Sequence, residues 1–275
     1  MRVKPSGIVT LLTDFGYKDP YVAMMKGVIL SVNPAARIID ITHDVKAGHI
    51  TQAAAIIQET YPYFPEGTVH VTVVDPGVGS ERRGIALLTR SHLFVGPDNG
   101  IFWPIMDAHP DINIIHLTET RYFLPHVSHT FHGRDIFAPV AGHLSRGVDP
   151  FKMGSVIDNP VQLKRPAPYQ KGDTLFGQVV RVDHFGNLIT NIHRKEIEGF
   201  TGGRTPVIRL GDLIIKGILK TYAQKGKGET LALFGSSGYL EIGVNLGRAA
   251  DLLGVDDTKI IGTQVEVNRS LEDHS

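Results

Sequence analysis

The sequence predicts an α/β protein with two parts: an N-terminal mainly parallel sheet flanked by helices in Rossmann-like layers, and a C-terminal small β-barrel. Through residues 1–160, short β-branched runs alternate with stretches whose apolar residues recur at helical spacing, the pattern of strand–helix–strand units with right-handed crossovers. Residues 174–275 instead carry short apolar runs separated by Gly, Asp and Asn turns. Residues 161–173 are rich in Pro, Lys, Arg and Gln without periodicity, so we expect a linker there.

The first domain begins with a compact apolar strand and a well-marked helix. Residues 8–12 form the strand, and in residues 21–32 the apolar positions recur at helical spacing. The helix should end before Asn33-Pro34, because the residue preceding a proline is disfavoured in helices. The other elements expected in this domain are strands over residues 38–41, 69–74, 85–88, 92–95 and 116–122 and helices over residues 50–60 and 136–144.

The second domain is expected to consist mainly of short strands. Glycine, aspartate and asparagine clusters interrupt its apolar runs at the spacing of a small barrel. One helix is expected near residues 246–253. The expected strands lie over residues 177–182, 188–192, 206–210, 213–218, 230–234 and 260–267.

The composition limits the classes of partner. Lys plus Arg and Asp plus Glu number 28 each, so a formally neutral chain offers no electrostatic footing for nucleic acid or an anionic membrane. The absence of cysteine excludes disulfides, thiolate nucleophiles and Cys-ligated metals, and is compatible with a reducing cytoplasm. No apolar stretch reaches membrane-spanning length, and the N-terminus lacks a signal-type apolar region. We therefore expect a soluble cytoplasmic protein without nucleic-acid or membrane partners.

Two carboxylates stand where predicted strands end. Asp14 follows the first strand and Asp75 follows a buried β-branched run, and ligands of open α/β sheets bind at that end of the strands. The Pro-Gly-Val-Gly after Asp75 permits a tight loop, which Arg82 and Arg83 follow. This arrangement suits a small polar or cationic organic ligand. From this segment alone, a surface turn with a capping Asp and solvated arginines explains the pattern equally well.

A histidine-rich loop precedes the last helix of the first domain. His126, His129 and His132 are spaced by three, which invites a metal-site interpretation. No other acid or histidine shows a recognised partner spacing, and loop histidines are usually solvated or hydrogen-bonded. We therefore expect no metal site here.

Two turns of the second domain carry an aromatic side chain among Gly and Asn. Phe185 lies in residues 183–187, and Tyr239 lies in residues 234–239. The two rings could form a stacking and hydrogen-bonding face for a heterocycle. Hairpin turns with an aromatic ring packed on the barrel are the simpler account of each turn by itself.

Seven motifs are distributed, in order, over both domains. They are Thr-Asp-Phe-Gly at 13–16, Phe-Pro-Glu-Gly-Thr-Val at 64–69, Val-Asp-Pro-Gly-Val-Gly at 74–79, Gly-Pro-Asp-Asn-Gly at 96–100, Thr-Phe-His-Gly-Arg-Asp at 130–135, Asp-His-Phe-Gly-Asn-Leu-Ile-Thr-Asn at 183–191 and Ser-Ser-Gly-Tyr-Leu at 236–240. Together they resemble the S-adenosyl-L-methionine hydroxide adenosyltransferase family, which is related to the fluorinase and chlorinase that make halogenated adenosines. Each motif is weak alone, but the ordered set is specific and spans nearly the whole chain.

The resemblance implies hydrolysis of S-adenosyl-L-methionine to adenosine and methionine, with no metal and no other cofactor. Water, activated as hydroxide, would attack the ribose 5′ carbon, and methionine would leave as a neutral thioether. The family's catalytic residues fall on Asp75, Arg82 and His132, with the adjacent Arg83 as the other candidate for the arginine role. The fluorinase has tyrosines at the positions of Asp75 and His132 and a halide-contacting serine at that of Gly133. The polar set here therefore favours water activation over halide transfer.

The resemblance also implies where the substrate binds. Asp14 would hold the two ribose hydroxyls with its carboxylate. Ser237 departs from the fluorinase, which has an arginine at that position near the methionine end. The family further implies a homotrimer whose ligand lies between the first domain of one subunit and the barrel of the next. The adenine and amino-acid portions would meet Asp183, Asn187, Ser236 and Tyr239, with Asp19, Tyr21 and Gly133 nearby and Val244 and Asn245 in backbone contact with adenine.

Two other functions remain open. A non-catalytic adenosine or S-adenosyl-L-methionine sensor would bind ligand without turnover, although the intact set of acid, arginine and histidine argues against it. A metal-dependent phosphatase or nuclease would lose activity in a chelator, but its candidate ligands match no recognised metal spacing. Those candidates are Asp14, His43, Asp44, Asp75 and Asp135.

Overall fold

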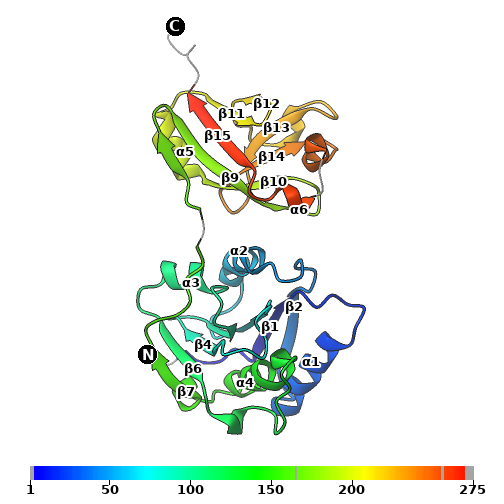
Figure 1. Ribbon diagram of the computed structural model, residues 1–275, viewed down its shortest axis with the longest axis vertical. Helices are drawn as coiled ribbons and strands as arrows, with labels where there is room; N and C mark the ends of the chain where they lie inside the picture. Colours follow the sequence, from blue (N-terminus) through cyan, green and yellow to red (C-terminus); the bar gives the residue numbers. More distant parts are fainter. Residues whose placement is uncertain (1–2, 165, 255–256, 270–275) are drawn as a thin grey trace. The chain divides into compact units, whose positions relative to one another are not determined.

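The structure is a computed structural model that describes residues 3–164, 166–254 and 257–269. The chain divides into two compact units, residues 1–164 and residues 165–275 (Figure 1). The division falls within the stretch expected to be a linker. Each unit has its own core and is described by itself.

The first unit is built on a seven-stranded mixed sheet with the order β2-β1-β3-β5-β4-β6-β7. The pairings from β2 to β5 are parallel, and those from β5 to β7 are antiparallel. The α/β class is confirmed, but the sheet is mixed because a short loop joins β4 to β5 and turns the chain back. The strands are β1 (Ile8–Thr13), β2 (Arg37–Thr42), β3 (Val69–Val73), β4 (Gly84–Leu88), β5 (Leu93–Pro97), β6 (Asn113–Leu117) and β7 (Gly154–Ile157).

Helices cover both faces of this sheet (Figure 1). Helices α1 (Tyr21–Val32) and α4 (Ala138–Ser145) enclose one apolar core, and α2 (Ile50–Thr60) and α3 (Trp103–Ala108) enclose another. Side chains of successive strand residues alternate between the two cores, as the pleat of a sheet requires. Helix α3 was not predicted, because six residues are too few to reveal a helical period.

Short helical turns connect the main elements of the first unit. The strand expected over residues 116–122 ends at Leu117, and a 3-10 turn follows it. The helix expected over residues 136–144 is α4, preceded by a π-helical turn. These turns are η1 (Tyr61–Tyr63), η2 (Thr120–Tyr122), the π turn η3 (Gly133–Phe137) and η4 (Pro150–Lys152).

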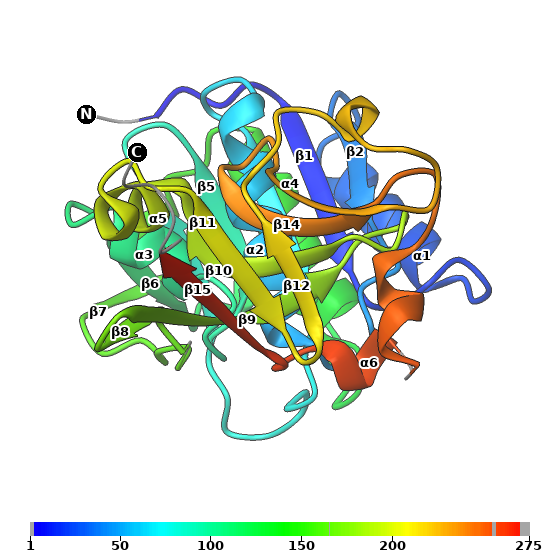
Figure 2. The same cartoon turned by 90° about the horizontal axis from the view of Figure 1, so that it is seen from above.

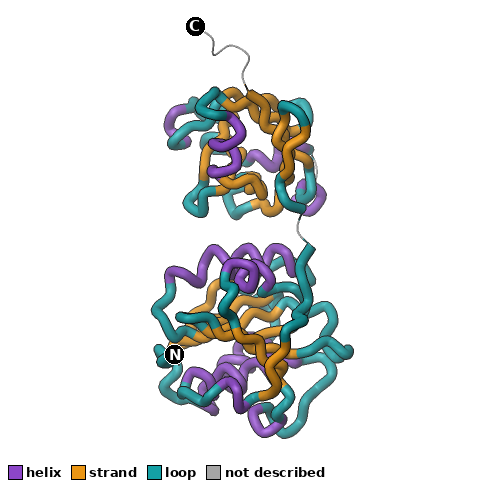
Figure 3. The backbone as a smooth tube through the Cα atoms, turned by 90° about the vertical axis from the view of Figure 1, so that its left-hand side faces the viewer, coloured by secondary structure: helices purple, strands orange, loops and turns teal. Residues whose placement is uncertain are grey.

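The second unit is a nearly closed antiparallel barrel, whose strands form a ring in Figure 3. Its strand order is β12-β11-β15-β9-β10-β14-β13, with β15 lying between β11 and β9 (Figure 2). The amide of Leu219 donates to Ala232 O at 2.8 Å, which links the segment that follows β12 to β13 at the other end of this path. The strands are β8 (Tyr169–Lys171), β9 (Thr174–Val182), β10 (Leu188–His193), β11 (Pro206–Leu210), β12 (Leu213–Lys216), β13 (Thr230–Phe234), β14 (Tyr239–Val244) and β15 (Gln264–Arg269).

The second unit contains elements that the sequence pattern did not predict. Helix α5 (Arg194–Thr201) is capped by His193, whose side chain accepts from the Lys195 amide and whose own amide donates to the Glu196 carboxylate, and it ends at Gly202 with positive φ. Strand β14 begins at Tyr239, the last residue of the expected turn, and continues through residues for which no element was expected, and β8 lies within the expected linker and pairs with β9. The remaining helical segments are η5 (Tyr222–Gln224), η6 (Ala249–Leu253) and α6 (Asp257–Ile260).

Among the residues that the structure describes, no helix is long and apolar enough to span a membrane.

A chain of buried polar groups crosses the sheet beneath α2. Thr10 Oγ1 lies 2.8 Å from His70 Nδ1, and His70 Nε2 lies 3.2 Å from His92 Nδ1. The His70 ring stacks on Phe94, and Tyr61 packs edge-on against His92. Burial, assisted by the neighbouring His92, lowers the pKa of His70 to about 3. The folded domain therefore holds His70 neutral at physiological pH.

This neutral histidine should make the first unit sensitive to acid. Below the ordinary pKa of 6.5 the unfolded chain binds a proton at His70 that the folded chain refuses, so the free energy of unfolding falls as the pH falls toward about 3. The slope for one such group is at most about 1.4 kcal/mol per pH unit. His70→Gln should remove most of the pH dependence that His70 contributes to the free energy of unfolding. Urea unfolding at several pH values, followed by the fluorescence of Trp103, the single tryptophan, measures this dependence. The exposed His126→Gln is the control; an unchanged slope in His70→Gln would contradict the neutral state.

Candidate active site

Three side chains from two separate segments meet at one edge of the first unit. Arg82 Nε donates to Asp75 Oδ1 at 3.1 Å, and its Nη2 donates to Asp75 Oδ2. The same Nη2 lies 3.0 Å from His132 Nδ1. The structure thus brings together the acid, guanidinium and imidazole that the resemblance singled out, with the guanidinium in the middle.

The loop after β3 positions Asp75. Hydrogen bonds from Ser80 to the Gly77 carbonyl close its turn. Gly79 has φ of +78°, and a Cβ there would lie 2.2 Å from the His129 carbonyl oxygen. Only glycine permits this approach, because any side chain would collide with backbone. The loop that carries Asp75 and Arg82 therefore rests directly on the segment that leads to His132.

His132 stands at the start of the π turn η3 and is fixed by the residue before it. Phe131 is buried, with edge-on ring contacts at 5.7 Å to Phe15 and 5.2 Å to Tyr21. Single π-helical turns occur often at functional sites. Here the turn lies where the chain enters α4, so that the imidazole is anchored by both an aromatic cluster and a helix.

Burial shifts the pKa values of the acid and the imidazole in this cluster. The side chains of Asp75 and Arg82 are only 5% and 8% exposed. Burial raises the pKa of Asp75, against the opposing effect of Arg82, while burial and the Arg82 charge lower the pKa of His132. A guanidinium can only donate, so a neutral His132 must accept at Nδ1 and carry its hydrogen on Nε2.

Arg83, the other candidate for the arginine role, is engaged elsewhere. Its Nε donates to Asp98 Oδ2 at 2.8 Å, and its two terminal nitrogens donate to Asn159. Asp98 also accepts from the amide of Val161 at 2.8 Å. Arg83 therefore ties the loop to residues 98 and 159–161, and Arg82 is the arginine that reaches Asp75.

Asp14, like Asp75, lies at the carboxyl end of a parallel strand of the sheet. It follows β1, and its Oδ2 accepts from the amide of Gly48 at 2.8 Å. Gly48 in turn lies beside Pro76, because a Cβ on Gly48 would be 3.9 Å from Pro76 Cβ. The ends of the parallel strands β1 and β3 thus present two carboxylates on neighbouring loops.

The other first-unit residues expected near the substrate do not contact the cluster of Asp75, Arg82 and His132 through a described hydrogen bond. Tyr21 lines a hollow of about 400 Å³ with Phe15 and Arg134, whereas Asp19 is exposed to solvent. Gly133 is buried, and a Cβ there would lie 3.3 Å from Met25 Sδ and from the Phe131 ring. The backbone behind His132 is therefore packed against the aromatic cluster.

The second unit has its own open pocket of about 930 Å³. Asp183 and Asn187 form one side of it, where the Asn187 amide and side chain donate to both Asp183 oxygens at 2.8 and 2.9 Å. Phe185, which is exposed, stands at the rim. The expected site residues that line this pocket are Asp183, Asn187, Ser236, Val244 and Asn245.

Comparison with known protein families finds a match in each of the two units. Residues 9–154 match the model of the SAM hydroxide adenosyltransferase N-terminal domain, and residues 177–261 match that of the C-terminal domain. The chain belongs to the SAM hydroxide adenosyltransferase family. The resemblance inferred from the ordered motifs is thereby confirmed.

Individual relatives of the family cover almost the whole chain. A protein named (R)-S-adenosyl-L-methionine hydrolase from Salinispora tropica is 36% identical over 258 residues, covering 91% of this chain and 95% of the relative. A fluorinase from Actinoplanes sp. is 28% identical over 280 residues, covering 89% and 93%. The crystal structure of an uncharacterized conserved protein from Thermotoga maritima superposes with a TM-score of 0.88 at 35% identity, covering 95% of this chain and all of that one.

Two of the residues expected to bind the substrate in the second unit have other contacts. The Tyr239 ring packs edge-on against His193 at 5.3 Å and does not line the pocket. The amide of Asn245 donates to Glu229 O at 3.0 Å, and its carbonyl accepts from Gly228. Both backbone groups of Asn245 therefore hold the loop over residues 225–229 in place.

Tyr222 lines the pocket and was not singled out from the sequence. Burial, together with the nearby Glu241 and Asp183, raises its pKa to about 12. Its ring lies on β14 at Gly243, where a Cβ would come within 2.8 Å of the ring. In the sequence, the Thr-x-x-Gln capping box that begins at Thr221 marks this turn. The sequence does not, however, distinguish a tyrosine that lines a pocket from one that is packed in a core.

The metal-ligand candidates do not gather at one point. Within residues 3–164, 166–254 and 257–269, no group of three or more His, Asp or Glu side chains is arranged to hold a metal ion. Asp75 pairs with Arg82, and the fully buried Asp135 pairs with Arg134.

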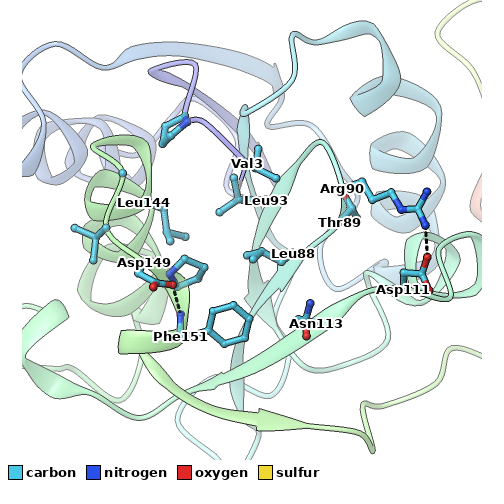
Figure 4. Close-up of a pocket in the computed structure, with 14 residues that line it drawn as sticks. Val3, Leu88, Thr89, Arg90, Leu93, Asp111, Asn113, Leu144, Asp149 and Phe151 are labelled. Carbon is cyan, nitrogen blue, oxygen red and sulfur yellow. Dashed lines mark hydrogen bonds and ion pairs between the residues drawn. The ribbon is translucent and has the colours of Figure 1, made fainter. Parts of the chain in front are cut away.

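A pocket of about 650 Å³ lies at the opposite ends of the first unit's strands from Asp14 and Asp75 (Figure 4). Its wall is mainly apolar, with Leu88, Leu93 and Phe151 around the hollow. The exposed ion pair of Arg90 and Asp111 stands at one side. None of the residues expected to act on or bind the substrate lines it.

The contact at Gly79 should be sensitive to a single methyl group. Gly79→Ala adds both backbone strain and a collision with His129, and should lower the free energy of unfolding by about 1–3 kcal/mol more than strain alone. Gly7→Ala is the matched control, since Gly7 has φ of +76° with nothing within 4 Å of its Cβ direction. Urea unfolding followed by Trp103 fluorescence measures both variants. Equal losses would show that the two loops do not depend on this contact.

Proposed function

We propose that this chain hydrolyses S-adenosyl-L-methionine to adenosine and L-methionine, by attack of an activated water on the ribose 5′ carbon. The buried cluster of Asp75, Arg82 and His132 is the observation that carries the proposal. Membership of the family supports it, as do relatives named (R)-S-adenosyl-L-methionine hydrolase. In the reaction the water oxygen bonds to C5′, the C5′–S bond breaks, and methionine leaves as a neutral thioether with the bonding electrons.

Within the cluster, Asp75 takes the proton of the water. His132 accepts from Arg82 at Nδ1, so its Nε2 carries a hydrogen and donates to the nucleophile. A carboxylate has lone pairs beyond the two that Arg82 uses, and a raised pKa makes it a stronger base. Arg82 holds both partners and stabilises the developing hydroxide by its charge.

The substrate's other parts bind the residues around this centre. Asp14 accepts hydrogen bonds from the two ribose hydroxyls, and the pocket of the second unit holds the adenine against Asp183 and Asn187. The assembly is a homotrimer in which the ligand lies between the first domain of one subunit and the barrel of the next. We also place the enzyme in the cytoplasm, a location that a cysteine-free sequence suits.

Isotope labelling tests the reaction directly. Purified protein with S-adenosyl-L-methionine in ¹⁸O-water and a chelator should yield methionine and adenosine labelled at the 5′ hydroxyl, as read by mass spectrometry. Asp75→Asn should stop turnover because the proton acceptor is lost, while adenosine still binds. Unlabelled adenosine would reject water attack at C5′. Binding without any product would favour a sensor, and activity that appears only without chelator would favour a metal-dependent hydrolase.

The two adjacent arginines should differ sharply. Arg82→Lys keeps the charge but loses the fork that holds Asp75 and His132, and should lower kcat by about 10²-fold or more. Arg83→Lys should leave kcat nearly unchanged while lowering stability, because its partners are Asp98 and Asn159. Steady-state kinetics on both variants, with Trp103 fluorescence as a folding check, make the comparison. A greater loss of kcat in Arg83→Lys would reverse the assignment.

A further inference from the structure

A buried histidine braces the turn that carries Asp14. His43 follows β2, and its side chain is completely inaccessible to solvent. Its Nδ1 lies 2.7 Å from Thr13 Oγ1, and its backbone carbonyl accepts from the Gly16 amide at 2.9 Å. The same segment then supplies the Gly48 amide that donates to Asp14 Oδ2. The chain on both sides of Asp14 is therefore fixed by residues 43–48.

On its other side, His43 faces Asp40. His43 Nε2 lies 3.1 Å from Asp40 Oδ1 in a geometry short of a full hydrogen bond, and neither atom has another hydrogen-bond partner among the described residues. Burial opposes ionisation of Asp40, but the hydrogen bond from Lys26 and the close contact with His43 outweigh it and lower the pKa of Asp40. Lys26 Nζ lies 2.6 Å from the second carboxylate oxygen, and Tyr17 also donates to it. Asp40 is thus an ionised acceptor.

These contacts give the chain of polar groups a single direction. A carboxylate can only accept, so it favours the tautomer of His43 that has its hydrogen on Nε2. His43 Nδ1, which then carries no hydrogen, accepts from the Thr13 hydroxyl. Among the described residues, Nδ1 is the acceptor with which this hydroxyl hydrogen bonds. Thr13 Oγ1 in turn accepts from the amide of Phe15 at 3.3 Å. The chain ends at the two residues that flank Asp14.

We propose that His43, held between Asp40 and Thr13, is a positioning residue that aims the Asp14 carboxylate at the vicinal hydroxyls of a ribose. The role rests on the proposed function, since it presumes a nucleoside substrate. The Gly48 amide donates a hydrogen bond to Asp14 Oδ2, and Asp14 Oδ1 has no hydrogen-bond partner among the described residues. A carboxylate that must meet two hydroxyls together tolerates little rotation, so the turn beneath it has to be rigid.

A role in ribose recognition differs measurably from a role in folding alone. If the turn serves only the fold, loosening it weakens every nucleoside alike. If it aims Asp14, loosening it weakens only nucleosides that have ribose hydroxyls. Adenosine and 2′,3′-dideoxyadenosine share the same base and differ in those hydroxyls, so the pair of ligands isolates the interaction.

The test compares variants of Thr13 in the full-length protein by calorimetric titration. Thr13→Val removes the hydroxyl at nearly constant shape and should weaken adenosine about tenfold, the loss of about 1.4 kcal/mol. The affinity for 2′,3′-dideoxyadenosine should stay at the wild-type value. Thr13→Ser restores the hydroxyl and should restore adenosine binding. Thr72→Val is the matched control, because Thr72 is equally buried on the neighbouring strand and its hydroxyl has no partner among the described residues.

Each outcome bears on one claim only. Equal weakening of both nucleosides, or no weakening of adenosine, in Thr13→Val would overturn the positioning role. A wild-type protein that binds neither nucleoside and releases no adenosine from S-adenosyl-L-methionine would instead overturn the proposed function. If Thr13→Val does not fold, Asp40→Ala makes the same test, since its side chain is 24% exposed. It removes the acceptor for Nε2 and should produce the same hydroxyl-dependent loss.

Discussion

The structure of the first unit depends on a guanidinium buried between an acid and an imidazole. Arg82 gives two donors to Asp75, a third to His132 Nδ1 and a fourth to the Arg83 carbonyl. Removing one partner of such a buried ion pair costs about 3–5 kcal/mol, because the remaining charge is left in a poorly solvating place. The end of β3, the turn closed by Gly77 and the π turn before α4 all serve to bring these three groups within reach of one another.

The same burial that makes the cluster costly also makes it reactive. Removal from water disfavours both charged forms, so Asp75 holds a proton more readily than a solvated carboxylate and His132 less readily than a solvated imidazole. The charge of the central Arg82 opposes the first effect and adds to the second, because it lowers the pKa of both groups. A base, a donor and a fixed positive charge then lie within hydrogen-bonding distance of one another, which suits the capture of a proton from water beside a sulfonium leaving group.

The sequence allowed much of this fold to be predicted, and the failures have physical reasons. The central strands were evident because buried parallel strands read as β-branched runs of limited length. Helix α3 and strand β14 were missed because one is shorter than two turns and the other begins within a glycine-rich turn. The choice between Arg82 and Arg83 was open, since adjacent loop residues can point in opposite directions and only the folded structure shows which one meets Asp75. The resemblance to a family, rather than spacing, pointed to His132, because nothing local links it to the loop after β3.

Because Gly79 packs directly against the His129 carbonyl, the positions of two backbone segments that are far apart in the chain depend on each other. An insertion in either segment would push the two backbones apart by more than a side-chain rearrangement could absorb. Changes of length in this protein's relatives should therefore occur in both places together or in neither, and a graft of one segment into another scaffold would need the other to accompany it.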